Sequence, residues 1–309
     1  HRPVSAPEGR RPAGVAGGPR VVAIGGGHGL AATLRAVRTY AGRVTAIVSV
    51  ADDGGSSGRL REELGIVPPG DLRKCLVALS DASSASARRL ATAFEYRFES
   101  DELSGHALGN LVIAGLMAST GDLQVALDEA GEMLGSAGRV LPAASEPVLL
   151  VAETGSGQVR GQTAVMGTPG IEHISIVPPD VAAPPAALEA IEEADQVVFG
   201  PGSLFTSILA ALAVPEITTA VSKCSARRVY VANLRPQRGE SAGLDIAGHI
   251  GALMRHGVMI DAVVVDTTSI GLGDTDGFGV QVVESKVAKP NGLAHDPGKL
   301  AEVLAGLVA

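Results

Sequence analysis

Residues 20–50, "RVVAIGGGHGLAATLRAVRTYAGRVTAIVSV", contain the pattern that decides the fold. The apolar run "RVVAIGGG" ends in glycines, "LAATLRAVRTYA" has apolar residues at helical spacing, and "RVTAIVSV" is a second run rich in β-branched residues. A strand, a helix and a strand in this order form a unit with parallel strands and a right-handed crossover. The sequence therefore predicts an α/β protein with a parallel sheet.

After a middle region with a different pattern, the chain returns to alternating strands and helices. Residues 71–134 show helical spacing without strands, which predicts a helical insertion on the sheet. The runs "RVLPAA", "PVLLVAET" and "QVRGQTAVM" follow, separated by glycine and proline, and predict antiparallel strands or a hairpin. The alternation returns with "PAALEAIEEA", "DQVVFG", "TSILAALA", "RRVYVANL" and "DAVVVD". We expect one doubly wound, mostly parallel Rossmann-like domain over residues 21–309, with a small antiparallel element.

The bulk composition limits the classes of function. With 309 residues, of which 46% are hydrophobic and 19% charged, the chain can bury a substantial core. Its formal net charge of -8 disfavours binding to nucleic acid or to an anionic membrane. No apolar run approaches the roughly 20 residues of a membrane helix, and residues 1–20 are typical of a flexible leader. Cys75 and Cys224 form neither a disulfide framework nor a zinc motif, which indicates a cytoplasmic location.

The first strand ends in the glycine-rich loop "GGGHGL". Its glycines allow backbone N–H groups to approach a phosphate at the N-terminus of the following helix, and a tight turn without a ligand is the alternative. As a dinucleotide fingerprint the loop is equivocal, because Gly27-x-Gly29-x-x-Ala32 fits only if the strand runs late. The candidate ligand-binding residues here are Gly26, Gly27, His28, Gly29 and Leu30.

The second strand ends in "ADDGGSSG", which carries two adjacent carboxylates. Asp52 lies about 20 residues after the glycines, where a dinucleotide site has its ribose-binding acid, but that role does not explain Asp53. Adjacent carboxylates repel each other, so each needs a hydroxyl, ammonium or metal partner unless the loop is a solvated turn. Gly55, Ser56 and Ser57 add backbone and hydroxyl donors to this candidate site.

Two further motifs precede apolar helices. In "PPGDLRKCL", Asp71 suits either a helix N-cap or a ligand contact. Arg73 in the first turn opposes the helix dipole, so we expect it to pair with a phosphate, with Asp71 or with a nearby Glu. In "GHALGN", Asn110 follows His106 and suits a structural role as well as a ligand contact.

The second half of the chain supplies two more loops at strand ends. "GPGSLF" combines Gly200, Gly202 and Ser203 before a helix, which predicts a second anion site. "NLRPQRGES" contributes Asn233 and Gln237 as candidate ligand contacts, and its Arg235 and Arg238 are explained equally well by surface exposure.

These motifs, in this order and together with "VLPAA", resemble the YvcK-type gluconeogenesis factor family, which is related to the CofD 2-phospho-lactate transferases. The resemblance implies a cytoplasmic, doubly wound α/β protein that binds UDP-sugars, notably UDP-N-acetylglucosamine. It also implies links to peptidoglycan precursor supply, cell shape and growth on gluconeogenic carbon sources, and to control of glucosamine-6-phosphate synthase. We expect this synthase or another cell-wall enzyme as a partner, and we expect a homo-oligomer. The family has no firmly assigned reaction.

The chain departs from the family pattern at several positions. His28 stands where many members have Thr, and Arg235 and Arg238 stand in a motif that is commonly the less basic "NLMTQPGE". Ala294 in "GLAHDPGKL" stands where the family pattern leads us to expect a basic residue before His295 and Asp296. If that residue holds a phosphate in relatives, this chain must use another group.

Three hypotheses of different classes follow. The first is a regulator that binds UDP-N-acetylglucosamine, with glycine loops on the diphosphate and with acids and amides on hydroxyl groups. The second is a CofD-like transferase of a nucleotide-linked phosphoryl group, in which Asp52 and Asp53 hold magnesium. The third is an NAD-binding oxidoreductase, although no residue spacing identifies a hydride-transfer site.

Overall fold

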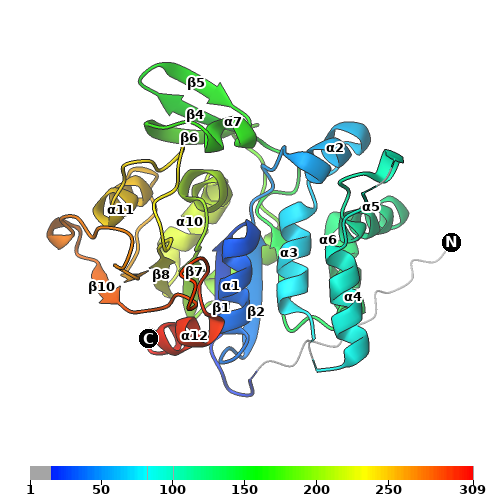
Figure 1. Cartoon of the computed structure of the whole chain (residues 1–309), viewed down its shortest axis with the longest axis horizontal. Helices are drawn as coiled ribbons and strands as arrows, with labels where there is room; N and C mark the ends of the chain where they lie inside the picture. The colour runs from blue at the N-terminus through cyan, green and yellow to red at the C-terminus, as the bar shows by residue number, and fades with distance from the viewer. Residues whose placement is uncertain (1–14, 82, 100, 309) are drawn as a thin grey trace.

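The computed structural model describes residues 15–81, 83–99 and 101–308 of the chain (Figure 1). The leader expected at 1–20 falls largely on residues 1–14, which lie outside the described residues. Strand β1 begins at Arg20, next to the expected start of the folded part at residue 21.

The main sheet confirms the predicted α/β class. Within the described residues, parallel strands form a seven-stranded sheet in the order β10-β9-β8-β7-β1-β2-β3. Helix α1 (Gly27–Val37) connects β1 to β2 as the opening sequence predicts. The strands are β1 (Arg20–Gly25), β2 (Arg43–Val48), β3 (Arg139–Pro142), β7 (Gln196–Phe199), β8 (Arg227–Val231), β9 (Ala262–Val265) and β10 (Gln281–Glu284).

The order of the strands creates a topological switch point between β1 and β7. From β1 the chain continues to β2 and β3 on one side, and β7 leads to β8, β9 and β10 on the other. Ligands of open α/β sheets bind beyond the carboxyl ends of the strands at such a point. The strand order alone therefore predicts a ligand site beyond the carboxyl ends of β1 and β7.

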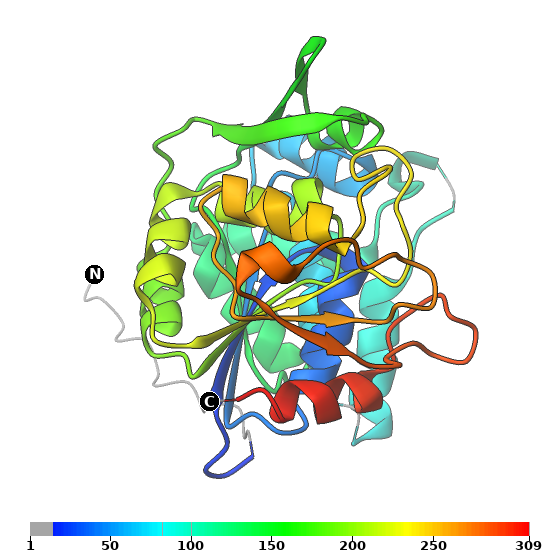
Figure 2. The ribbon, with the colours of Figure 1, turned by 90° about the vertical axis from the view of Figure 1, so that its left-hand side faces the viewer.

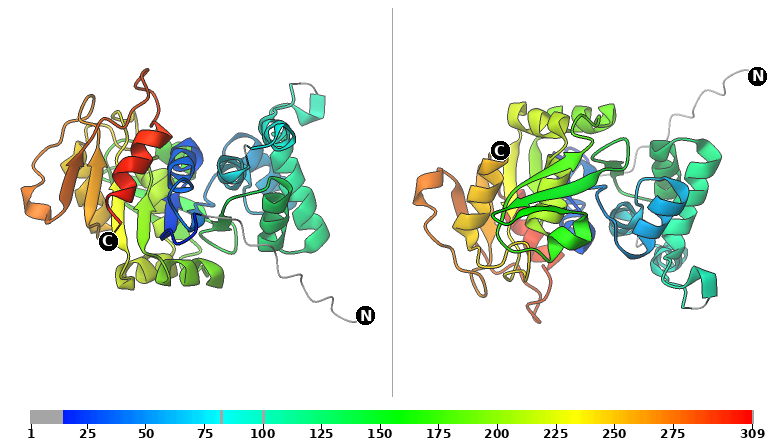
Figure 3. Two further views of the ribbon diagram at one scale, coloured as in Figure 1. Left: turned by 90° about the horizontal axis from the view of Figure 1, so that it is seen from below. Right: turned by 90° about the horizontal axis from the view of Figure 1, so that it is seen from above.

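Apolar strands explain why the sheet is covered on both faces. Every residue of β7 and β9 is buried, as expected for parallel strands that lie between two helical layers. Burying one Val, Leu, Ile or Phe side chain contributes about 1.5–3 kcal/mol. Helices α1 and α12 (Pro297–Ala305) cover one face, and α8 (Pro185–Glu192) and α10 (Pro215–Lys223) cover the other (Figure 3).

A group of helices lies beside the β3 edge, between β2 and β3 in sequence (Figures 1 and 3). It begins earlier than the insertion expected at 71–134, because "GSSGRLREEL" starts a helix at Gly55 instead of remaining a loop. A buried face with Ser56, Ser57 and Leu60 holds that first helix against its neighbours. The helices are α2 (Gly55–Leu64), α3 (Gly70–Leu79), α4 (Ala85–Glu95), α5 (Leu108–Thr120) and α6 (Leu123–Met133).

The expected antiparallel element is correct for only part of its sequence. β4 (Leu149–Thr154) pairs antiparallel with β5 (Gly157–Arg160) and β6 (Ile171–Val177). The run "RVLPAA" is different, because β3 pairs parallel with β2. Its buried Val140 and Leu141 follow helix α6, so this segment completes a further helical crossover. In "QVRGQTAVM" the strand ends at Arg160, and Gly161, at φ 91°, leads into the short helix α7 (Gln162–Met166).

The small sheet projects above the carboxyl ends of the main strands (Figure 2). Side chains of the main body hold it in place. The Thr163 amide donates to Asp53 Oδ1 at 2.9 Å, and the Ile174 amide donates to His256 Nε2 at 3.0 Å. The Ile174 bond holds β6 directly, and the Thr163 bond holds helix α7, which follows β5, so both tie the small sheet to the main body.

The helix expected at "TSILAALA" has an unusual start. Residues Leu204–Leu209 form the π-helix η2, and Ala210–Leu212 continue it as α9. Helix α11 (Ile246–Arg255) lies within the range expected near 243–255. In the described residues no single helix has the length and apolarity to cross a membrane. The bent pair Leu204–Leu212 and Pro215–Lys223 has that length and apolarity only when the two helices are taken together.

Candidate functional site

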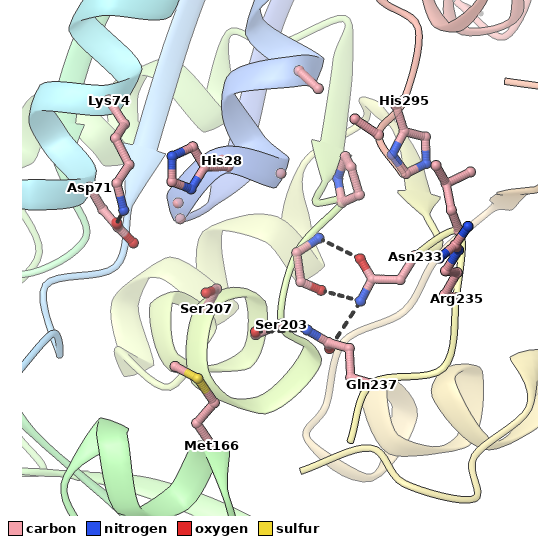
Figure 4. A pocket seen from close by; sticks show the side chains of 18 of the residues that line it. His28, Asp71, Lys74, Met166, Ser203, Ser207, Asn233, Arg235, Gln237 and His295 are labelled. Atoms are coloured by element: carbon pink, nitrogen blue, oxygen red, sulfur yellow. Dashed lines mark hydrogen bonds and ion pairs between the residues drawn. The ribbon is translucent and has the colours of Figure 1, made fainter. Parts of the chain in front are cut away.

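A cavity of about 520 Å³ lies at the carboxyl ends of β1, β2, β7 and β8, over the switch point (Figure 4). Its size is in the range of pockets for small-molecule ligands, about 300–1,000 Å³. The candidate residues that line it are Gly26, Gly27, His28, Gly29, Asp52, Asp71, Gly202, Ser203, Asn233 and Gln237. Those outside the lining are Leu30, Asp53, Gly55, Ser56, Ser57, Arg73, Asn110 and Gly200.

The glycine loop after β1 packs backbone to backbone against the loop after β7. A Cβ built on Gly29 would clash with the carbonyl oxygen of Pro201. The Thr33 hydroxyl donates to the carbonyl oxygen of Gly200 at 2.6 Å, which holds helix α1 to the same loop. Glycine is therefore required at position 29 by the close approach of two chain segments, and this approach shapes the floor of the pocket.

The N-terminus of helix α1 already faces a protein carboxylate. A Cβ built on Gly26 would lie 2.6 Å from Asp71 Oδ2, so the carboxylate occupies the space beside this N-cap residue. Asp71 Oδ1 also accepts a hydrogen bond from Lys74 Nζ at 2.9 Å. The N-cap alternative for Asp71 is wrong, because the residue lies inside the first turn of α3, whose N-cap is Pro69. Instead, Asp71 contributes a buried, lysine-paired carboxylate to the pocket.

The adjacent acids Asp52 and Asp53 point to different partners. Asp52 lines the pocket, and its Oδ1 accepts the Gly54 amide at 3.0 Å. Asp53 lies outside the lining, and its Oδ1 accepts both the amide of Thr163 at 2.9 Å and its hydroxyl at 2.7 Å. Burial raises the pKa of Asp52 most, the Gly54 amide opposes this shift, and the nearby charge of Asp71 adds to it. Asp52 and Asp71, not Asp52 and Asp53, are therefore the carboxylates that the pocket brings together.

His28 stands at the first turn of α1, on the Asp71 side of the pocket (Figure 4). Burial and the positive charge of Lys74 lower the pKa of His28, with burial the larger cause. A ligand at neutral pH therefore meets a neutral imidazole, which can donate one hydrogen bond and accept another.

The loop after β7 is held by side chains of the segment after β8. Asn233 accepts the Gly202 amide at 3.1 Å and donates to the Gly202 carbonyl at 2.8 Å. It also donates to Gln237 Oε1 at 3.0 Å, and Gln237 donates to Ser203 Oγ at 3.1 Å. Both amides line the pocket, and both position "GPGS" (Figure 4).

The N-terminus of η2, expected to hold an anion, has a carboxylate partner within the protein. Glu240 Oε2 accepts the Thr206 amide at 2.9 Å, and the Glu240 side chain is buried. Burial raises the pKa of Glu240, while hydrogen bonds from Thr206 oppose that shift. Because the Gly202 amide is already bonded to Asn233, an anion at this loop would contact Ser203 at the pocket surface instead of the buried helix end.

Several candidate residues form a buried network beneath the helical group instead of a ligand site. Ser56 Oγ lies 3.0 Å from His106 Nδ1 and accepts a hydrogen bond from Asn110 Nδ2 at 3.0 Å. Arg73 donates to Asn110 Oδ1 at 2.9 Å and pairs with Glu95 at 2.5 Å. The alternative of a nearby Glu is therefore correct for Arg73, and the structural role is correct for Asn110.

The other candidates outside the lining also serve the fold. Ser57 Oγ accepts the Gly70 amide at 3.1 Å and joins α2 to α3. Leu30 is part of the core, and Gly55, at φ 50°, starts α2. Gly200 accepts the Thr33 hydroxyl beneath the pocket.

Sequence reasoning missed part of the lining. Lys74 could have been found, because it lies three residues after Asp71 on the same helical face. His295 is buried, its Nε2 lies 3.2 Å from the Ala232 carbonyl oxygen, and burial lowers its pKa to about 4. Arg235 and Ala294, which the sequence marks only as departures from the family pattern, also line the pocket. The remaining lining residues outside the candidate set are Ala32, Gln162, Met166, Pro201, Ser207, Leu234 and Leu293.

A magnesium ion would find its donors at Asp52 and Asp71. Magnesium is commonly bound by one or two carboxylates together with substrate phosphates, and both carboxylates face the cavity. The described residues contain no group of three or more His, Cys, Asp or Glu side chains arranged to hold a metal ion. Such an ion would therefore depend on the ligand for its remaining contacts.

Comparison with known proteins agrees with the fold. The family model described as 2-phospho-L-lactate transferase CofD matches residues 21–276. A crystal structure of a UPF0052 family protein from Bacillus halodurans has a TM-score of 0.86 at 37% identity, and the match covers 92% of this chain and 97% of that chain. Fold and site thus define a CofD-type α/β protein with a pocket at the switch point.

Relatives of known name narrow this class. A relative from Mycobacterium tuberculosis, provisionally named a gluconeogenesis factor, is 42% identical over 309 residues, covering 94% of this chain and 90% of the relative. The "Gluconeogenesis factor" of Halalkalibacterium halodurans is 43% identical over 250 residues, covering 79% of this chain and 76% of the relative. The chain belongs to the gluconeogenesis factor family, as its motifs predict.

Proposed function

We propose that this protein binds a UDP-sugar, UDP-N-acetylglucosamine, and acts as a cytoplasmic regulator that links carbon metabolism to peptidoglycan precursor synthesis and cell shape. The observation that carries the proposal is that one cavity has both carboxylates and hydrogen-bond donors on its walls. Asp52 and Asp71 offer hydroxyl-binding carboxylates, the loop at Gly26–Gly29 offers backbone donors, and Ser203 offers a hydroxyl. A sugar nucleotide carries both hydroxyl groups and a diphosphate, so it matches both kinds of group.

Titration calorimetry with the intact protein tests this proposal. We expect saturable binding of UDP-N-acetylglucosamine, weaker binding of GDP and NAD, and no product when the mixture is later separated by chromatography. Absence of heat with every UDP ligand would refute the proposal. Preference for NAD would instead support the oxidoreductase hypothesis.

A CofD-like transferase is the second candidate, and the family match over residues 21–276 favours it. Asp52 and Asp71 would hold the magnesium ion, which when bound supplies charge neutralisation to a phosphoryl group. The expected sign of this activity is nucleotide consumption that depends on magnesium and an added hydroxyl acceptor. Chromatography of the nucleotide pool with and without EDTA separates it from the regulator.

The proposed regulator acts as a homo-oligomer with glucosamine-6-phosphate synthase as its partner. Light scattering coupled to size exclusion tests the oligomer. Mixing the purified proteins with and without UDP-N-acetylglucosamine tests the partner, and a complex that ignores the ligand contradicts a sensing role.

A further inference from the structure

The pocket contains one permanent cation without a counter-ion among the described residues, and it is Arg235. Lys74 is paired with Asp71, and the buried His295 has a pKa lowered to about 4. Arg235 lines the pocket and is exposed, and none of the described residues forms an ion pair or hydrogen bond with it. An unpaired guanidinium at a pocket wall is free to bind a ligand.

The chain holds Arg235 in a fixed turn. Asn233 and Gln237, two residues before and after it, are bonded to each other at 3.0 Å. The same amides are bonded to Gly202 and Ser203 across the pocket floor. Arg235 therefore projects from a turn that is closed on itself and anchored to the loop after β7, so its backbone loses little freedom when a ligand binds.

The positions that would ordinarily attract a phosphate already face protein carboxylates. Asp71 lies beside Gly26 at the start of α1, and Glu240 accepts the Thr206 amide at the start of η2. Lys74 is already balanced by Asp71, and Glu240 already accepts the Thr206 amide, so a diphosphate needs a cation from another part of the pocket. Arg235 lies on the opposite side of the cavity from Asp71 and Lys74, next to the segment that carries His295 (Figure 4).

We propose that Arg235 is the anion anchor of the pocket and sets the direction of the bound nucleotide. Its guanidinium binds the diphosphate on the β8 side, and hydroxyl groups of the ligand face Asp52 and Asp71 on the α3 side. Arginine suits this role because its planar donors bind two phosphate oxygens at once. The inference rests on the proposed binding of a UDP-sugar.

Calorimetry on matched variants tests the anchor. Arg235→Gln removes the charge, Arg235→Lys retains it, and Arg238→Gln removes an exposed arginine of the same segment that does not line the pocket. We expect Arg235→Gln to lower the affinity for UDP-N-acetylglucosamine and for UDP by about tenfold to hundredfold and to leave the affinity for uridine unchanged. Arg235→Lys recovers part of the loss, and Arg238→Gln binds like the original protein.

Salt dependence supplies a second readout. Affinity for UDP should fall with rising salt in the original protein and in Arg238→Gln, and should fall less steeply in Arg235→Gln. Unchanged UDP affinity and salt dependence in Arg235→Gln would overturn the anchor while leaving the proposed function intact.

If no UDP ligand binds, inorganic pyrophosphate tests the anchor role of Arg235 separately from the proposed binding of a UDP-sugar. A rise in Tm with pyrophosphate that Arg235→Gln abolishes and Arg238→Gln retains would support the anchor without the proposed function. No rise in the original protein, or an equal rise in all three, would overturn the anchor.

Discussion

Asp52 and Asp53 are neighbours in the chain, but their carboxylates act on different parts of the molecule. The Asp52 side chain faces the cavity, and the Asp53 side chain holds Thr163 of helix α7. Each carboxylate has hydrogen-bond donors of its own, the Gly54 amide for Asp52 and Thr163 for Asp53, which offsets the repulsion between two adjacent acids. The loop thus combines a ligand-facing group with a structural one.

This division predicts opposite outcomes for two matched substitutions. Asp52→Asn should lower the affinity for UDP-N-acetylglucosamine at least tenfold with little change in Tm, because it alters a side chain that faces the ligand cavity. Asp53→Asn should retain affinity and lower the free energy of unfolding by about 1–3 kcal/mol, because it weakens charge-assisted bonds to Thr163. Calorimetry and urea unfolding measure the two effects, and equal loss of affinity in both variants would contradict the division.

Gly29 provides a second prediction at this scale. Gly29→Ala forces a Cβ against the Pro201 carbonyl oxygen, so we expect a loss of stability of about 1–3 kcal/mol and weaker ligand binding. Gly115→Ala is the control, because Gly115 is exposed in helix α5 and a Cβ there meets open space. The control should gain up to about 1 kcal/mol, since alanine favours a helix more than glycine does.

The urea midpoints of both variants, measured with and without ligand, check this prediction. Equal or higher stability of Gly29→Ala would show that the two loops can separate at no cost.

At the scale of elements, the parallel strands were predictable because their apolar residues are continuous and glycines end them. The strand at Arg139–Pro142 was not, because a short run beside glycine and proline fits a hairpin as well as a parallel edge strand. The start of α2 was missed because "GSSG" has poor helix propensity. Burial of Ser56 and Ser57 among neighbouring helices overrides that propensity.

Helical phase explains which site residues could be predicted. Arg73 and Lys74 are adjacent in α3, and one residue turns a helix by about 100°. Arg73 therefore points to Asn110 and Glu95, while Lys74 points to Asp71 and the pocket. Composition marks both residues as cations, but only the packing of α3 decides which one a ligand meets.

At the scale of the whole molecule, topology fixed the edge of the sheet at which the pocket lies. The glycine loop, Asp52, Asp71 and the "GPGS" loop all follow strand ends or their helices, so sequence order brings them together. Gln162 and Met166 enter the pocket only because the small sheet folds over it, and no local pattern predicts that placement.

Buried histidines predict how the stability of the whole molecule depends on pH. Burial lowers the pKa of His249 to about 4, as it does for His295, from an ordinary value of 6.5. Between these values the unfolded chain binds protons that the folded chain does not, so stability is retained above about pH 6.5 and lost as pH falls toward 4. Each histidine contributes up to about 3 kcal/mol to this loss.

Urea unfolding at a series of pH values measures the effect. We expect His249→Leu to make the free energy of unfolding less dependent on pH between 4 and 6.5, with His295 still contributing. The same pH dependence in the variant would contradict the assignment.

The two bonds that hold the small sheet have a consequence for hydrogen exchange. The amides of Thr163 and Ile174 donate to the side chains of Asp53 and His256, not to neighbouring strands. Their exchange therefore needs only the release of one side chain, whereas amides in β1 and β7 need the main sheet to open. The rate of deuterium uptake at these two amides therefore measures how often the small sheet and helix α7 open above the pocket while the rest of the molecule stays folded.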